Sequence, residues 1–78
     1  MKVVLAKVNE TYFDGEAFSL TAPGVEGEVT ILSNHEAFVT TLKPGVVSIK
    51  KTREDIGQQF EINGGVLEVR AEGATIIL

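Results

Sequence analysis

Short runs of alternating apolar and polar residues, separated by turns rich in Gly, Pro, Asn and Asp, limit the possible fold of this chain more than any other feature. Side chains of a β-strand point to opposite faces in turn, so such runs are typical of strands with one buried face. The runs recur roughly every eight to ten residues, and no segment has the sustained period of about 3.6 residues that indicates an amphipathic helix. The sequence therefore predicts an all-β domain, a small flattened β-sandwich or barrel of about eight to ten short strands that spans residues 1–78.

The alternation also indicates which strands lie in the interior of a sheet and which side chains point to the core. Residues 2–8 are expected to form an interior strand, because both of its faces are partly apolar. In the strand at 46–51, Val47 and Ile49 are expected to point inward. The further expected strands are 17–22, 28–31, 38–42, 59–62, 67–70 and 74–78.

Turn residues predict how some of these strands connect. Asn63-Gly64-Gly65 predicts a hairpin with a type I′ turn, since both central positions of that turn need positive φ. Residues 13–16 contain Asp-Gly and are expected to form a turn. The strands 28–31 and 38–42 are expected to be neighbours in the sheet.

The composition favours a folded domain that is stabilised by apolar packing. The chain has 78 residues, 44% of them hydrophobic, no cysteine, one histidine and a net charge of −4. A domain of this size buries roughly 60% of the surface that its unfolded chain exposes, which leaves room for one core. The negative charge disfavours nucleic acid, and a single histidine without cysteine does not make a zinc site. We expect no metal, no cofactor and no nucleic-acid partner.

The sequence has no membrane-spanning or secretory segment that we recognise. No apolar run approaches the roughly 20 residues that cross a bilayer. At the amino terminus, Lys7 interrupts the apolar residues before a signal sequence would be complete. A cytoplasmic location is therefore expected.

The residue types needed for a nucleophile, a base and an orienting carboxylate occur close together at Ser33, His35 and Glu36. The surrounding sequence has neither a nucleophile-elbow glycine pattern nor an obvious oxyanion donor. We therefore expect His35 to be a solvated loop or contact residue rather than a catalytic one. The glycine-containing turns are followed by no Lys-Ser or Lys-Thr pair, so they do not predict a phosphate-binding loop.

Four of the seven basic residues fall between positions 43 and 53. Such a cluster can bind an acidic partner, or it can be a solvated strand end, and the sequence leaves both interpretations open. The four residues are Lys43, Lys50, Lys51 and Arg53.

The stretch 23–49, which holds both prolines and the histidine, carries a family resemblance. Its motifs are Pro23-Gly24, Gly27-Glu28, Ile31-Leu32, His35 and Thr40-Thr41-Leu42-Lys43-Pro44-Gly45-Val46-Val47 with Ile49, followed by Phe60, Gly64-Gly65 and Leu67-Glu68-Val69. In this order and spacing they resemble the N-terminal β-sandwich of the ATP synthase ε subunit, over nearly the whole chain. The sequence departs from the family pattern, which usually has Gly, Pro, Gly and Pro, at Thr30, Ser33, Asn34 and Ala37.

The resemblance implies a non-catalytic rotor subunit in the central stalk of a proton-translocating ATP synthase. Such a subunit links the γ subunit to the c-ring and supports the coupling of proton transport to ATP synthesis. It would lie peripherally at the cytoplasmic face of the inner (plasma) membrane, contact the membrane only through the complex, and be monomeric when isolated. Family members typically continue into two C-terminal helices that carry inhibition and, in some, an ATP-binding motif. No helical hairpin is predicted within these 78 residues. If 78 residues is the native length, we expect neither inhibition of hydrolysis nor nucleotide binding.

Two sets of residues are predicted to make these contacts. Glu28 and His35 match the loop positions that face the c-ring in the family. The apolar, β-branched segment 38–42 beside a polar loop suits the core of an interface with γ, and its residues are Phe38, Thr40, Thr41 and Leu42. The alternative is a free-standing β-sandwich module that binds another protein or forms a homo-oligomer.

Overall fold

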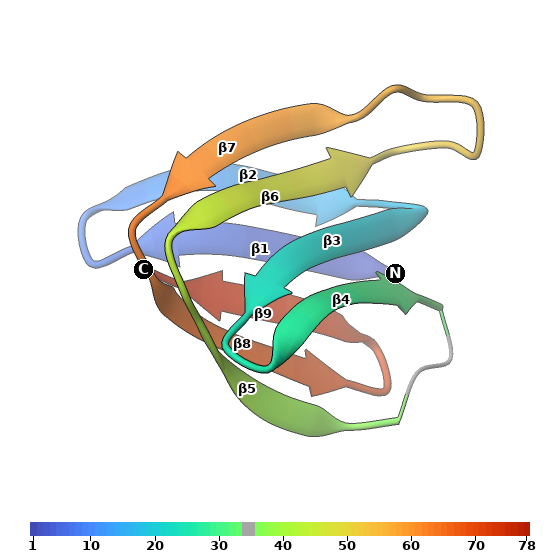
Figure 1. Ribbon diagram of the computed structural model, residues 1–78. Helices are drawn as coiled ribbons and strands as arrows, with labels where there is room; N and C mark the ends of the chain where they lie inside the picture. Colours follow the sequence, from blue (N-terminus) through green and yellow to red (C-terminus); the bar gives the residue numbers. More distant parts are fainter. Residues whose placement is uncertain (34–35) are drawn as a thin grey trace.

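The computed structural model describes residues 1–33 and 36–78, and within them it contains nine strands and no helix (Figure 1). The prediction of an all-β fold with about eight to ten short strands is confirmed. The strands are β1 (Lys2–Lys7), β2 (Glu10–Glu16), β3 (Ser19–Gly24), β4 (Gly27–Leu32), β5 (Phe38–Leu42), β6 (Gly45–Lys50), β7 (Gln58–Ile62), β8 (Gly65–Arg70) and β9 (Gly73–Ile77).

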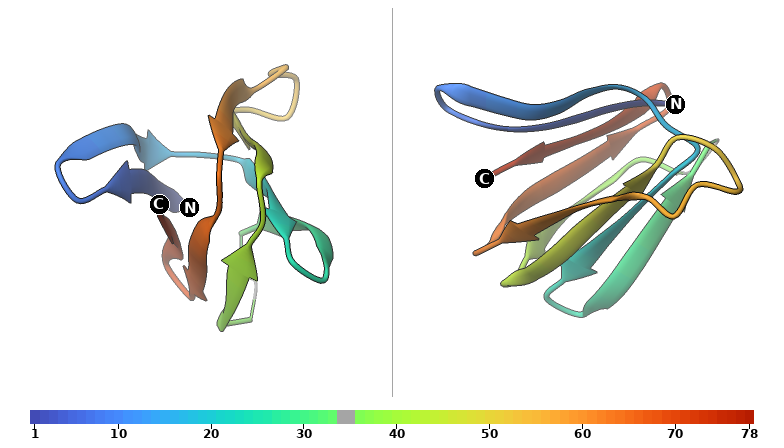
Figure 2. Two further views of the ribbon diagram at one scale, coloured as in Figure 1. Left: turned by 60° about the vertical axis from the view of Figure 1, so that its left-hand side comes forward. Right: turned by 90° about the horizontal axis from the view of Figure 1, so that it is seen from above.

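The strands form one sheet that curls over into two layers (Figure 2). The first layer has the order β2-β1-β9-β8-β5, and the second has the order β4-β3-β6-β7. Strand β1 lies between β2 and β9, antiparallel to the former and parallel to the latter, so its predicted interior position is confirmed. The layers are joined where the end of β3 pairs with the end of β5.

The chain passes between the layers at two adjacent corners. Leu42 at the end of β5 pairs with Gly65 at the start of β8, and Gly45 at the start of β6 pairs with Ile62 at the end of β7. Only two residues separate β5 from β6, and only two separate β7 from β8. Each pair of strands is therefore close to one long strand with a bend, and the two bends lie side by side. Strands that switch layers in this way make the corners of a β-sandwich.

The predicted hairpin at Asn63-Gly64-Gly65 is therefore wrong. Strand β7 pairs with β6, whereas β8 pairs with β5 and β9. Gly64 and Gly65 do have positive φ, 134° and 149°. At Gly65 the reason is a close approach between strands, since a Cβ there would lie 2.7 Å from the Ile77 carbonyl oxygen. The glycines serve a bend between layers rather than a tight turn.

Two other expectations about connections are wrong. Residues 13–16 are the second half of β2, because Asp14 and Gly15 pair with Val4 and Val3 of β1. The turn between these strands lies instead at residues 8–9. Strands β4 and β5 are present as predicted, but they are not neighbours: β4 pairs with β3, and β5 pairs with β8.

The core lies between the two layers and is made by the inward side chains of alternating strands. Val47 and Ile49 are fully buried, as the alternation in β6 predicts. Burying a side chain of this kind contributes roughly 1.5 to 3 kcal/mol relative to leaving it in water. The largest fully buried side chains, drawn from both layers, are Leu5, Leu20, Ile31, Ile49, Leu67, Ile76, Val3 and Val47.

Candidate interaction surfaces

The outer face of the first layer carries a row of uncharged side chains that crosses all five of its strands. Successive members of this row are register partners on adjacent strands. Val66 and Ile77, which are 45% and 51% exposed, supply most of its apolar area. We call the row the uncharged strip, and its residues, from β5 to β2, are Thr41, Val66, Ile77, Ala6 and Thr11.

The same face becomes charged towards its other end. Arg70 Nη1 donates to Glu68 Oε1 over 2.7 Å, and Lys2 Nζ lies 3.2 Å from Asp14 Oδ1. These ion pairs are exposed, so each contributes at most about 1 kcal/mol to stability. Interface cores are depleted in charged residues, and the uncharged strip is therefore the part of this face best suited to contact another protein.

The predicted γ-facing segment forms β5 with the expected bounds, but its side chains divide between two faces. Phe38, Thr40 and Leu42 lie on the inward face, because they are register partners of Val69, Leu67 and Gly65. Leu42 is only 3% exposed and belongs to the core.

The residues of β5 that point outward are Val39, which is 66% exposed, and Thr41. Thr41 belongs to the uncharged strip. Of the four residues predicted for this contact, the structure thus leaves one on the outer face, and it adds Val39, which the prediction omitted.

Sequence reasoning missed Val66, Ile77 and Ala6 as members of a surface. A signal for them was present, since β1, β8 and β9 each have apolar residues at consecutive positions. Apolar residues at consecutive positions of a strand place apolar side chains on both faces. Only one of those faces can point to the core of a two-layer sandwich.

Glu28 is exposed in β4, opposite Pro23 of β3 and close to the β3–β4 turn. His35 lies outside the described residues. Ser33 and Glu36, the described residues on either side of 34–35, are both exposed, and Ser33 follows the other end of β4. Glu28 and Ser33 are therefore separated by the length of that strand, about 17 Å at the usual rise per residue.

The predicted basic cluster is divided in the structure. Lys43 follows β5 at the corner between the layers, whereas Lys50 ends β6 and is followed by Lys51 and Arg53. Three of the four basic residues thus remain together, in and beside the β6–β7 loop.

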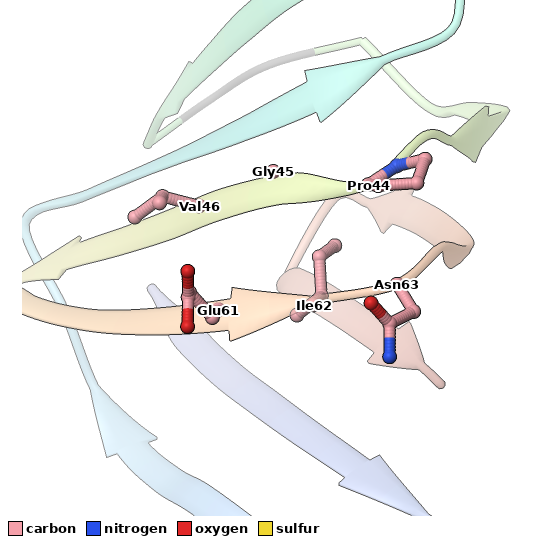
Figure 3. Close-up of a pocket in the computed structure, with 6 residues that line it drawn as sticks. All are labelled: Pro44, Gly45, Val46, Glu61, Ile62 and Asn63. Atoms are coloured by element: carbon pink, nitrogen blue, oxygen red, sulfur yellow. The ribbon is translucent and has the colours of Figure 1, made fainter.

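A recess of about 410 Å³ lies over the corner where β5–β6 and β7–β8 bend (Figure 3). Glu61 supplies a carboxylate to its wall, and among the described residues that line the recess no other is titratable or nucleophilic. General acid–base or nucleophilic chemistry needs such a partner, so the recess gives no argument for catalysis. The lining residues are Pro44, Gly45, Val46, Glu61, Ile62 and Asn63.

Within residues 1–33 and 36–78, no three His, Asp or Glu side chains gather into a possible metal site. That part of the chain also has no helix long and apolar enough to cross a membrane.

The whole chain, residues 1–78, matches the family described as ATP synthase, Delta/Epsilon chain, beta-sandwich domain. The chain belongs to this family. Several curated proteins named ATP synthase epsilon chain are similar to it. The protein from Herminiimonas arsenicoxydans is 35% identical over 99% of this chain, that from Sulfurimonas denitrificans 33% over 100%, and that from Caulobacter vibrioides 42% over 83%. This chain spans 55%, 59% and 73% of their lengths, respectively.

The fold of this chain is also similar to the folds of chains in solved ATP synthase structures. A chain of the Euglena gracilis mitochondrial ATP synthase superposes with a TM-score of 0.85 at 27% identity, over 96% of this chain and 48% of that one. A chain in the central stalk and c-ring of the Tetrahymena thermophila mitochondrial ATP synthase gives 0.79 at 25% identity, over 99% and 61%. Both neighbours come from assemblies of ATP synthase that include a c-ring.

Proposed function

We propose that this chain is a non-catalytic subunit of the central stalk of a proton-translocating ATP synthase, where it joins the γ subunit to the c-ring and supports coupling. The observation that carries the proposal is the match of all 78 residues to the ATP synthase β-sandwich family. The presence of similar chains in central stalk and c-ring assemblies supports it. On this proposal the subunit is peripheral, at the cytoplasmic face of the inner (plasma) membrane.

The γ contact is proposed to use the outer face of the first layer, with the uncharged strip at its centre. Val66 and Ile77 supply apolar area, and Thr41 and Val39 extend it along β5. The ion-paired residues at the other end, such as Arg70 and Glu68, would form the polar rim. An apolar centre with a polar rim is the usual anatomy of a stable protein interface.

The c-ring contact is proposed to involve Glu28 and His35, the positions that the resemblance indicates. Glu28 is free to meet a polar loop, since it is exposed and no ion pair is present at its side chain among the described residues. A close-packed sandwich between two such contacts deforms little, so it can transmit torque without chemistry of its own.

The proposal is tested by purifying the native protein with its partners. Stoichiometric γ and c subunits are expected, and a self-contained oligomer without them would contradict the proposal. Replacing Val66 and Ile77 by Glu should remove γ, because it buries unpaired charges at the contact. Gln59→Glu, on the exposed side of the second layer, is the matched control and should retain γ.

The c-ring contact needs its own measurement, since γ binding does not report on it. Single substitutions Glu28→Gln and His35→Ala are each expected to cost about 1 kcal/mol or less, as rim contacts usually do. The double variant should reduce proton pumping driven by ATP hydrolysis in membrane vesicles while hydrolysis continues. Unchanged pumping in the double variant would count against these two positions.

A further inference from the structure

The loop between β6 and β7, residues 51–57, is held in shape by the carboxylate of Asp55. One carboxylate oxygen accepts a hydrogen bond from the backbone N–H of Lys51 and the other from that of Gly57, both over 3.0 Å. The backbone N–H of Asp55 donates to the Thr52 carbonyl oxygen over 3.2 Å. The N–H groups of Lys51 and Gly57 hold the pKa of Asp55 below its ordinary value. The Asp55 carboxylate thus closes the loop by bonding to backbone N–H groups at both of its ends.

Gly57 fixes the loop against the sheet. Its φ is +92°, which favours glycine, and a Cβ at this position would lie 2.8 Å from Ser48 Oγ of β6. The loop backbone therefore approaches β6 more closely than any other residue type would allow without a shift.

Two basic side chains attach the loop to aromatic rings in and just after β2. Lys51 Nζ lies 5.8 Å from the ring centroid of Phe13 in β2, and Arg53 Cζ lies 5.4 Å from that of Phe18. Such cation–π contacts contribute about 0.5 to 1 kcal/mol at exposed sites. Both residues remain exposed, so their charges are still available to a partner.

Ile56 stands out of this restrained loop with 89% of its surface exposed. A single exposed apolar side chain needs no explanation on a mobile loop. Here Asp55 and Gly57 on either side are both held in place, so the backbone from which the isoleucine projects is fixed. A rigid apolar anchor loses little conformational entropy on binding, which favours affinity.

We propose that the 51–57 loop is a preformed docking site for an acidic protein surface. Ile56 enters an apolar recess of the partner, while Lys51 and Arg53 pair with carboxylates around that recess. The argument for an acidic partner is charge complementarity. Lys50 brings a third positive charge to the same place, and the three basic residues outnumber the exposed Glu54 of the loop. The carboxylate of Asp55 does not oppose the partner because it is occupied by backbone N–H groups.

A protein fits this site better than an anionic lipid surface does. One isoleucine buries too little apolar area to hold a domain at a membrane, where stable attachment takes larger apolar segments or lipid chains. A recess on a partner protein, in contrast to a bilayer, can bind the 51–57 loop without contacting the rest of the chain.

The position of the loop, taken with the proposed function, indicates the side of the complex on which the partner lies. A Cβ on Gly45, which begins β6, would lie 3.0 Å from Pro23, and Pro23 is the register partner of Glu28. The 51–57 loop follows the other end of β6. Leu32 of β4 and Lys50 of β6 both pair with Ser19, so the loop lies at the same end of the second layer as Ser33 and opposite Glu28. If the c-ring is contacted at the Glu28 end of β4 and not at the Ser33 end, the loop points away from the ring, towards the subunits of the catalytic head and its stalk. This step rests on the proposed function.

The test measures binding of the chain to the soluble part of an ATP synthase from which this subunit has been removed. Ile56→Asp is expected to weaken binding about tenfold, since it places a charge in an apolar recess of an acidic surface. The double variant Lys51→Glu/Arg53→Glu should weaken binding by a similar factor, mainly through slower association. It should also flatten the dependence of affinity on salt.

Matched controls occupy the other end of the sandwich. Val25→Asp changes an exposed valine in the β3–β4 turn, and Lys43→Glu reverses a basic residue at the corner. Both should bind as the original chain does, because the c-ring is absent from the probe. Equal binding by all loop variants would overturn the docking site and leave the proposed function intact. Failure of the unchanged chain to bind would instead contradict the proposed function.

The lipid alternative is excluded with vesicles. The unchanged chain is expected not to bind vesicles that contain one third phosphatidylglycerol at moderate salt. Binding that depends on Lys51 and Arg53 would overturn the proposal of a protein partner.

Discussion

Gly24 of β3 lies opposite Leu42 of β5, and this antiparallel pair joins the two layers of the sandwich. Two backbone hydrogen bonds flank it, from Val25 N–H to the Thr41 carbonyl oxygen and from Lys43 N–H to the Pro23 carbonyl oxygen, both over 2.9 Å. Strand β5 therefore holds the layers together with its backbone and its inward side chains, while its outward side chains remain available for a partner.

Substitutions in β5 should separate these two roles. Leu42→Ala is expected to lower the free energy of unfolding by about 2 to 5 kcal/mol, because it removes a buried side chain and leaves a cavity. Val39→Ala, on the outer face, should change it by less than about 0.5 kcal/mol. Urea unfolding of both variants makes the measurement. Equal losses would mean that β5 does not divide into an inward and an outward face.

Glycine at position 73 should be indispensable for the pairing of β9 with β1. A Cβ on Gly73 would overlap the Lys2 carbonyl oxygen, which belongs to the strand beside it. Gly73→Ala is therefore expected to force the two strands apart and to cost about 1 to 3 kcal/mol. Gly15→Ala is the control, since its Cβ would meet only a Phe13 ring carbon at 3.9 Å. A thermal melt of Gly73→Ala that matches the control would contradict this.

Thr40 and Thr41 should respond differently to the same substitution. Thr41→Arg places a charge in the uncharged strip beside Val66 and should weaken γ binding with little change in stability. Thr40→Arg places the same side chain on the inward face beside Leu67 and should lower the melting temperature more. Co-purification of γ and thermal unfolding give the two readouts. Retained γ binding by Thr41→Arg would remove β5 from the proposed contact.

The sequence predicted which residues face the core better than it predicted which strands pair. Alternation in β6 and β8 identifies the inward residues locally, because the period of a strand is fixed by its backbone. The partner of β7 depends instead on whether Asn63-Gly64-Gly65 folds back or bends between layers. Positive φ at Gly64 is compatible with both, so the choice is made by packing that the local sequence does not contain.

The interaction surfaces could be predicted from the sequence only in part. The sequence predicts the segment 38–42 as a strand beside a loop, but the predicted contact surface combines residues from both faces of that strand. A strand presents only every second residue to one side. The uncharged strip consists of residues from five strands, brought together by register pairs between β1, β2, β5, β8 and β9. Each of these strands contributes one member, so no strand reveals the strip by itself.

The 51–57 loop should depend on pH through Asp55. Hydrogen bonds from the Lys51 and Gly57 N–H groups favour the charged carboxylate, so the pKa of Asp55 in the folded chain lies below the ordinary value of 3.8. The contribution of these bonds is then fully present above about pH 3.8 and is lost only as the pH falls through the lower, folded pKa. The loop is therefore expected to stay closed at neutral and mildly acidic pH.

Amide chemical shifts provide the measurement. The Lys51 and Gly57 amide signals should remain constant from pH 7 down to about 4 and should move together below that, because protonation of Asp55 weakens both bonds. The amide of Val47, in the middle of β6, reports whether the sheet itself has begun to unfold and should move later. In Asp55→Ala, which has no carboxylate here, the joint movement should disappear. Two results would show that another group controls the loop: an inflection of the Gly57 amide shift above pH 4, or an inflection that persists in Asp55→Ala. Either result would contradict the proposal that Asp55 holds the loop in its preformed shape.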